Sequence, residues 1–122
     1  MSGPVYNRVA LIGLGLIASS MFWAMKRSGL AAEVTGYARS VETRNTAREI
    51  SLCDRVCDSA AEAVKGADLV VLCVPVGAME QVTKDISPHL MAGATVSDVG
   101  SVKRAVIDAV GPHLPSNVHF VP

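Results

Sequence analysis

The sequence predicts a doubly wound α/β domain, in which helices cover both faces of a parallel sheet, and three observations support this fold class. Short apolar segments alternate with helical ones along the chain, as in α/β proteins. The segment 69–74, Leu-Val-Val-Leu-Cys-Val, shows no polar alternation, as expected for a central parallel strand. A turn that begins at Gly13 joins the first apolar segment to a helical one. Right-handed crossovers follow from such an alternation.

Composition narrows the class of protein further. The chain of 122 residues has the size of one domain, and 50% of it is hydrophobic, which suffices for an aliphatic core. Eleven basic residues balance eleven acidic ones and are scattered, so we expect no nucleic-acid partner.

The cysteines and the apolar stretch near the N-terminus bear on the location of the protein. Cys53, Cys57 and Cys73 form no CxxC pair, so we expect neither a disulfide framework nor a metal site. Free cysteines fit a reducing compartment, and we therefore expect a cytoplasmic location. The uncharged stretch 9–25 is too short and too glycine-rich to suggest a membrane span or a signal peptide.

Two strand–helix units account for the first part of the chain. A buried strand is expected over 8–12, followed by an apolar helix that Gly29 ends. A second strand is expected over 33–38. Ser40 then has the position of an N-cap for a polar helix with one exposed face.

In the rest of the chain, residues that typically begin or end helices mark the boundaries of the expected elements. Ser59 and Glu62 have the spacing of a capping box for a short helix over 60–65, and Gly66 follows where a left-handed residue ends a helix. After the strand over 69–74, the expected elements are a helix ending at Ser87-Pro88, a strand over 95–99, an amphipathic helix after Ser101 that Gly111-Pro112 ends, and a strand over 118–121.

The glycine turn after the first strand is the segment that indicates a ligand-binding function. The motif Gly-Leu-Gly-Leu-Ile-Ala, from Gly13, matches the G-x-G-x-x-G/A fingerprint of Rossmann-type dinucleotide-binding domains and lies between a strand and a helix. Gly13 permits the tight turn, Gly15 lets a pyrophosphate approach the backbone, and Ala18 lets the helix pack closely on the strand. The N–H groups of Leu16 and Ile17 would face the phosphates. The alternative is a turn that merely joins strand to helix.

Residues at the end of the second strand bear on the cofactor. An acidic residue about 20 positions after the motif would bind the ribose hydroxyls and favour NAD. Ala38 occupies that position, and Arg39 and Ser40 offer a guanidinium and a hydroxyl able to bind a 2′-phosphate. We therefore expect NADP, with NAD still possible. In the alternative interpretation Arg39 is a solvated surface charge.

Further candidate residues follow the central strands, where ligands bind in open α/β sheets. Val74 and Pro75 lie beside the expected cleft, although Pro75 could simply end a strand. Ser101 is expected to cap the next helix and so to point it at the cleft. Lys103 is a candidate for binding an anionic substrate, and the alternative is a solvated charge. The three histidines pair with no acid or cysteine at ligand spacing, so the sequence supplies no evident general base.

Four segments together resemble the N-terminal domain of the prephenate/arogenate (cyclohexadienyl) dehydrogenases. They begin at positions 13, 36, 67 and 98 and are Gly-Leu-Gly-Leu-Ile-Ala-Ser-Ser, Gly-Tyr-Ala-Arg-Ser, Ala-Asp-Leu-Val-Val-Leu-Cys-Val-Pro-Val and Asp-Val-Gly-Ser-Val-Lys. The last is the most particular to the family. The resemblance implies an NAD(P)-dependent oxidative decarboxylation of prephenate or arogenate in tyrosine biosynthesis. It also implies that Ser101 is a catalytic residue, hydrogen-bonded near the nicotinamide and the substrate hydroxyl.

The resemblance also places two parts of the enzyme outside these residues. A histidine in a His-Pro segment after the sixth strand would be the base, and a helical C-terminal domain would complete the substrate pocket and form a homodimer; both are expected beyond Pro122. We therefore expect residues 1–122 to form one NAD(P)-binding domain that binds cofactor without turnover. Two alternatives stay open: another dehydrogenase with a similar N-terminal domain, against which the segment 98–103 speaks, and a stand-alone dinucleotide-binding module without catalysis.

Overall fold

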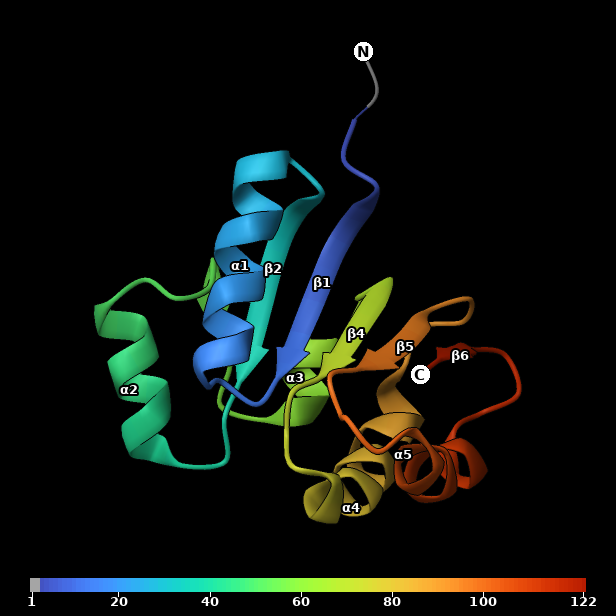
Figure 1. Cartoon of the computed structure of the whole chain (residues 1–122). Helices are drawn as coiled ribbons and strands as arrows, with labels where there is room; N and C mark the ends of the chain where they lie inside the picture. Colours follow the sequence, from blue (N-terminus) through green and yellow to red (C-terminus); the bar gives the residue numbers. More distant parts are fainter. Residues whose placement is uncertain (1–2) are drawn as a thin grey trace.

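A six-stranded parallel sheet organises residues 3–122, the residues that the computed structural model describes (Figure 1). The strands are β1 (Tyr6–Ile12), β2 (Ala31–Tyr37), β3 (Arg55–Val56), β4 (Leu69–Leu72), β5 (Thr95–Asp98) and β6 (His119–Val121). The helices are α1 (Leu16–Ser28), α2 (Val41–Glu49), α3 (Ala60–Val64), α4 (Val76–Ile86) and α5 (Lys103–Val110). The predicted doubly wound Rossmann-type fold is confirmed.

The strand order, β3-β2-β1-β4-β5-β6, reverses direction at β1. From β1 the chain adds β2 and β3 on one side, then returns to pair β4 with the other side of β1 and continues outward. In this central pair Val9 lies opposite Leu69, and Ile12 lies opposite Leu72. The loops that leave β1 and β4 therefore diverge, which opens a crevice of the kind that binds ligands. We call this end of the sheet the carboxyl edge and the other end the amino edge.

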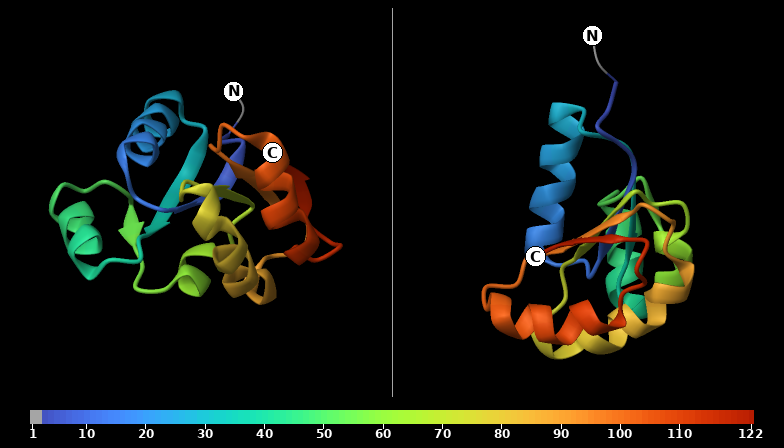
Figure 2. Two further views of the ribbon diagram at one scale, coloured as in Figure 1. Left: turned by 60° about the horizontal axis from the view of Figure 1, so that its bottom comes forward. Right: turned by 90° about the vertical axis from the view of Figure 1, so that its right-hand side faces the viewer.

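Helices cover the two faces of the sheet in separate groups, α1 and α2 on one face and α3, α4 and α5 on the other (Figure 2). Successive residues of β1 point to opposite faces, as strand geometry requires. Val9 and Leu11 join the cluster under α1, whereas Ala10 and Ile12 join the cluster under α3, α4 and α5. All four are at most 1% exposed. The uninterrupted apolar character of the central strands follows from this two-sided burial.

The structure contains the helix caps on which the predicted helix boundaries are based. Ser40 and Ser59 accept hydrogen bonds from backbone N–H groups three residues further on, so both are N-caps. Gly29 and Gly66 have φ of 69° and 73°, the left-handed conformation expected at helix ends.

The strands differ from the predicted ones at both edges of the sheet: β1 and β2 begin at Tyr6 and Ala31, two residues earlier than predicted. β4 ends at Leu72 and β5 at Asp98, earlier than the apolar runs suggest, because the chain leaves the sheet there to form loops. β3 was not predicted, since a two-residue strand at the sheet edge leaves no hydrophobic pattern.

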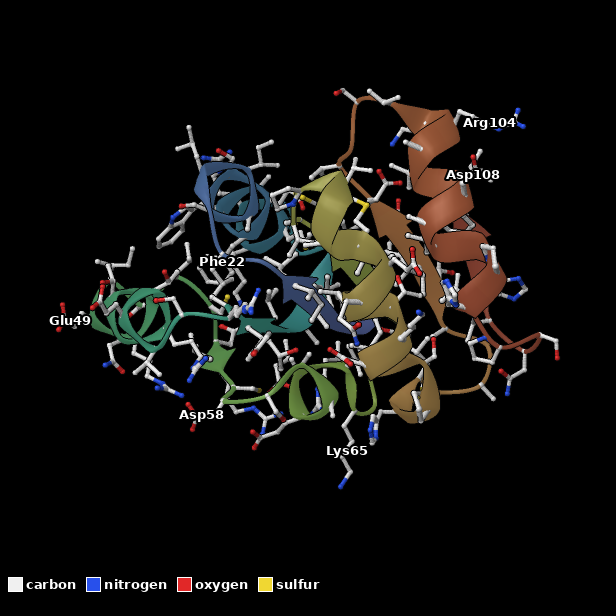
Figure 3. All side chains as sticks on the ribbon, turned by 90° about the horizontal axis from the view of Figure 1, so that it is seen from below. Phe22, Glu49, Asp58, Lys65, Arg104 and Asp108 are labelled. Carbon is white, nitrogen blue, oxygen red and sulfur yellow. The ribbon has the colours of Figure 1, made fainter. Side chains whose placement is uncertain are left out.

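Several charged side chains of the helices and their ends lie at the periphery of the fold (Figure 3). Phe22 packs inward and is 4% exposed, whereas Glu49, Lys65, Arg104 and Asp108 project outward from the helices and their ends. None of the helices formed by residues 3–122 has the length and apolar character that a bilayer crossing requires.

Candidate functional site

The turn between β1 and α1 crosses the end of β4 closely enough to require glycine. Gly13 has φ of 103°, and a Cβ added there would lie 2.9 Å from the carbonyl carbon of Cys73 and 2.9 Å from Val74 Cγ1. Its N–H donates to the carbonyl oxygen of Tyr37 at 2.8 Å. The turn is therefore fixed between the ends of β2 and β4, at the point where the strand order reverses.

Gly15 differs from Gly13 because the space beside it is open. It is the N-cap residue of α1, and a Cβ built there would meet no atom within 4 Å. Leu16 and Ile17 are exposed, and Ala18 is fully buried against the sheet. N–H groups in the first turn of a helix have no partner within it, so this open space adjoins free donors and the positive end of the α1 dipole.

A cavity of about 770 Å³ extends from this turn past the end of β2 and between α3 and α4. Among the residues that line it are Gly13, Tyr37, Arg39, Asp58, Ser59, Val74 and Pro75. The structure thus brings together four residues that the sequence singled out, namely Gly13, Arg39, Val74 and Pro75. We call this space the β2-side cavity, since it adjoins the end of β2.

The loop from β2 to α2 is held by an arginine that the sequence analysis did not identify. Arg44 Nη1 donates to the carbonyl oxygens of Ala38 at 2.7 Å and Arg39 at 3.0 Å. Its guanidinium lies 5.5 Å from the centre of the Tyr37 ring, within the range of a cation–π contact. Ala38 is 6% exposed, and the Arg39 side chain is exposed. Ser40 keeps an exposed hydroxyl although it caps α2.

Asp58 is a second residue that the sequence analysis missed, because its loop follows the unpredicted strand β3. It lies at the surface beside α3 (Figure 3), where its carboxylate is 2.8 Å from Arg48 Nη2 and 3.5 Å from Arg44 Nε. The hydrogen bond and charge of Arg48, with a further contribution from Arg44, lower the pKa of Asp58. The negative charge that faces the cavity is therefore balanced by two guanidinium groups.

The expectation that Ser101 caps α5 is wrong. Val102 is the N-cap residue of α5, and no side chain forms a capping hydrogen bond there. The loop is closed instead by Asp98, whose Oδ2 accepts from Gly100 N at 2.6 Å and from Lys103 Nζ at 2.8 Å. Lys103 is thus already paired with an anion, and Val102, the N-cap residue, is 60% exposed. Ser101 lies exposed in this loop.

The three histidines lie at the amino edge, away from Ser101. His119 begins β6 and pairs in register with Thr95, the first residue of β5. His89 and His113 follow the C-terminal ends of α4 and α5, which run antiparallel to the strands. The described residues therefore place no histidine beside Ser101. No group of three or more His, Cys, Asp or Glu side chains suited to a metal ion occurs within residues 3–122.

A doubly wound parallel sheet with a glycine turn where its strand order reverses defines a Rossmann-type nucleotide-binding domain. The family model "Prephenate dehydrogenase, nucleotide-binding domain" matches residues 22–122. The chain belongs to this family. The match begins within α1, after the glycine turn, so the turn supports nucleotide binding independently of the match. Membership in this family excludes the alternative that the chain belongs to a different dehydrogenase family.

Named relatives agree with this assignment. The chain is 41% identical over 114 residues to cyclohexadienyl dehydrogenase of Zymomonas mobilis, covering 93% of this chain and 39% of the relative. It is 31% identical over 119 residues to prephenate dehydrogenase of Bacillus subtilis, covering 94% of this chain and 31% of the relative. The chain therefore spans about two fifths or less of the length of these relatives.

Solved structures show the same fold. Prephenate dehydrogenase of A. aeolicus, crystallised with hydroxyphenyl propionate and NAD+, superposes with a TM-score of 0.80 at 26% identity, over 92% of this chain and 40% of that one. A 3-hydroxyisobutyrate dehydrogenase of Mycobacterium tuberculosis, 21% identical, superposes with a TM-score of 0.74 over 93% of this chain and 38% of that one. At that identity the second likeness concerns the fold alone.

Proposed function

We propose that this chain is the cofactor-binding domain of a cytoplasmic, NADP-dependent prephenate or arogenate dehydrogenase of tyrosine biosynthesis. The observation that carries the proposal is the open backbone at Gly15, next to free helix N–H groups and at the reversal of the strand order. Family membership supports the reaction class, and the A. aeolicus relative, described with NAD+, supports a nicotinamide dinucleotide as cofactor.

The residues present fit such a cofactor. Gly15 leaves room for the pyrophosphate, and the first-turn amides of Leu16 and Ile17 supply its donors. Ala18 keeps α1 close to the sheet, so these amides stand directly above the end of β1. The adenosine would then lie in the β2-side cavity, which Val74 and Pro75 also line.

Arg39 and Ser40 favour NADP over NAD. Ala38 supplies no carboxylate to repel a 2′-phosphate, and Arg39 lines the cavity with a free guanidinium. Arg44 holds the backbone of both Ala38 and Arg39, which fixes the direction in which the loop presents its side chains. Asp58, the nearby acid, has its charge balanced by arginines.

Ser101 is the residue of this chain that we place in the catalytic site. It follows the end of β5, which pairs with the end of β4 through Leu72 and Asp98, so its hydroxyl lies on the side of the glycine turn away from Arg39. There it would hydrogen-bond near the substrate hydroxyl. The bound nicotinamide would accept a hydride from the ring carbinol, and loss of carbon dioxide with aromatisation would make the step irreversible.

The proton-accepting base and the rest of the substrate pocket come from outside these residues in this proposal. The histidines described here lie at the opposite edge of the sheet, so none reaches the carbinol proton. A histidine in a His-Pro segment after the sixth strand would be the base, and a helical C-terminal domain would complete the pocket and form a homodimer. Whether prephenate or arogenate is used would depend on that domain.

Titration of the chain with NADPH and with NADH tests the proposal. We expect saturable binding of both, with NADPH at least about tenfold tighter, since one charge-assisted hydrogen bond contributes about 1.5–3 kcal/mol. Tighter binding of NADH would contradict the assignment of Arg39 and Ser40. Failure to bind either dinucleotide would contradict the proposed function.

A further inference from the structure

The last residue of β5 places a carboxylate inside the protein. The side chain of Asp98 is fully buried, and a buried charge is costly unless it is paired and hydrogen-bonded. Here the partners come from the next five residues. Asp98 Oδ2 accepts from Gly100 N at 2.6 Å and from Lys103 Nζ at 2.8 Å. The segment 99–102 is therefore folded around this oxygen, and we call it the β5–α5 loop.

Close packing fixes the loop from several sides. A Cβ added at Gly100 would lie 2.7 Å from Val106 Cγ2 and 3.0 Å from Asp98 Oδ2, so the backbone lies directly against α5 and the carboxylate. Val99 N donates to the carbonyl oxygen of Leu72 at 3.2 Å, which ties the start of the loop to β4. Ser101 and Val102 are left exposed at its tip.

Lys103 provides the positive charge that compensates Asp98. Both donors bind the same oxygen, Oδ2, and the buried Oδ1 has no hydrogen-bond partner among the described residues. Without the ammonium group, one backbone N–H would be the remaining partner of a buried charge. The conformation of the loop therefore depends on Lys103 as well as on Asp98, although the Lys103 side chain is 47% exposed.

The loop lies on the nicotinamide side of the proposed cofactor site. The ends of β1, β4 and β5 are adjacent in the sheet, with Leu72 between Ile12 and Asp98. A dinucleotide with its pyrophosphate over Gly15 and its adenosine toward Arg39 must extend its other half across β4 toward this loop. Such a placement follows from the crevice geometry of doubly wound sheets.

We propose that Asp98 and Lys103 form a clamp that positions Ser101 at the nicotinamide end of the cofactor. The inference rests on the proposed function, because it assumes the cofactor site described above. Lys103 is then a positioning residue that acts through Asp98 and the loop. It is not a receptor for an anionic substrate.

Two ligands separate this role from a general structural one. NADPH reaches both halves of the site, whereas adenosine 2′,5′-bisphosphate occupies only the adenosine half. We expect Lys103→Met and Asp98→Asn to weaken NADPH binding about tenfold, as loss of a charge-assisted hydrogen bond does, and to leave bisphosphate binding unchanged. Ser101→Ala should show the same selectivity. Lys84→Met, which removes an exposed ion pair with Glu80 on α4, is the matched control and should change neither affinity.

A second readout reports the clamp directly. Asp98→Asn and Lys103→Met should each accelerate hydrogen exchange at the Gly100 amide, and the double variant should lose no more NADPH affinity than the stronger single variant, because both remove one interaction. If Asp98→Asn does not fold, Lys103→Met carries the test, since its side chain is half-exposed.

Several results would overturn the clamp. They are an equal loss of affinity for both ligands, no loss for NADPH, or a wild-type chain that binds NADPH no more tightly than the bisphosphate. The last result would leave the proposed cofactor domain standing. Absence of binding by either ligand would instead remove the proposed function itself.

Discussion

Arg39 is the charged residue of the loop between β2 and α2, and this exposed residue lines the β2-side cavity. Replacing it removes a charge from the proposed 2′-phosphate site and leaves the ribose surroundings intact. We expect Arg39→Ala to weaken NADPH binding by about tenfold or more and to leave NADH binding nearly unchanged. Isothermal titration of both cofactors measures the difference.

Arg104→Ala is the control for this prediction. Arg104 has an 87% exposed side chain on α5 and carries the same charge away from the cavity. Equal losses for the two cofactors in Arg39→Ala would show that Arg39 supports the loop and does not read the phosphate.

Cys53 makes the stability of the domain depend on pH on the alkaline side. Burial raises the pKa of its thiol from 9.0 to about 12, and the negative charge of Asp54 adds to the shift. The folded state therefore holds this proton more tightly than the unfolded chain. Its contribution to stability is complete below pH 9 and is lost as the pH rises toward 12.

The prediction is read as a difference between two proteins. Between pH 9 and 11 the free energy of unfolding of the wild type should fall relative to Cys53→Ala by about 1.4 kcal/mol per pH unit. Urea denaturation under reducing conditions at several pH values measures it. A constant difference across this range would show that the thiol ionises equally well in the folded state.

The glycine turn between β1 and α1 contains two glycines with different roles. At Gly13 the positive φ and the nearness of Cys73 and Val74 forbid a side chain, so we expect Gly13→Ala to lower the free energy of unfolding by about 1–3 kcal/mol. At Gly15 the space is open, so Gly15→Ala should cost no more than the roughly 1 kcal/mol that alanine costs at an N-cap. It should nevertheless abolish tight NADPH binding, because the methyl group takes the place of the pyrophosphate.

Denaturation curves and NADPH titrations of the two variants test this division. Each variant is the other's control. A Gly15→Ala variant that unfolds in the absence of cofactor, or one that binds NADPH like the wild type, would contradict the assignment of the open space to the cofactor.

Elements with strong local signals could be predicted from the sequence, and those set by distant packing could not. β1 and β4 are buried on both sides, so their apolar runs are visible in the chain. Ser40 and Ser59 cap helices as predicted, because capping involves neighbours three residues away. β3 has two residues and no such pattern.

The same contrast between local signals and distant packing explains which parts of the candidate site could be predicted. The glycine motif is local, so the turn could be found, although its contact with the end of β4 could not. Ser101 has the sequence position of a cap, yet Asp98 closes the loop, because the burial of that carboxylate depends on packing between β5 and α5. Arg44 and Asp58 lie far apart in the chain and meet only when α2 packs beside the loop after β3.

For the domain as a whole we predict cofactor binding without turnover. A chain of residues 1–122 supplied with NADP+ and prephenate, or arogenate, should form no NADPH above background, because the described histidines lie at the edge of the sheet opposite Ser101. Absorbance at the NADPH band measures this. The same preparation must bind NADPH in the titration above, and substrate-dependent NADPH formation would show that a base lies within these residues.

The pairing of β1 with β4 also has a consequence for how the chain folds. Asp68, which precedes β4, accepts hydrogen bonds from the backbone of Asn7 and from Arg8, 60 residues away. β1 can therefore join β2 through a short crossover, but it must wait for a long loop to close before β4 docks. Contacts of such large sequence separation slow folding. Assembly of the crevice, which needs both strands, is thus expected among the last events of folding.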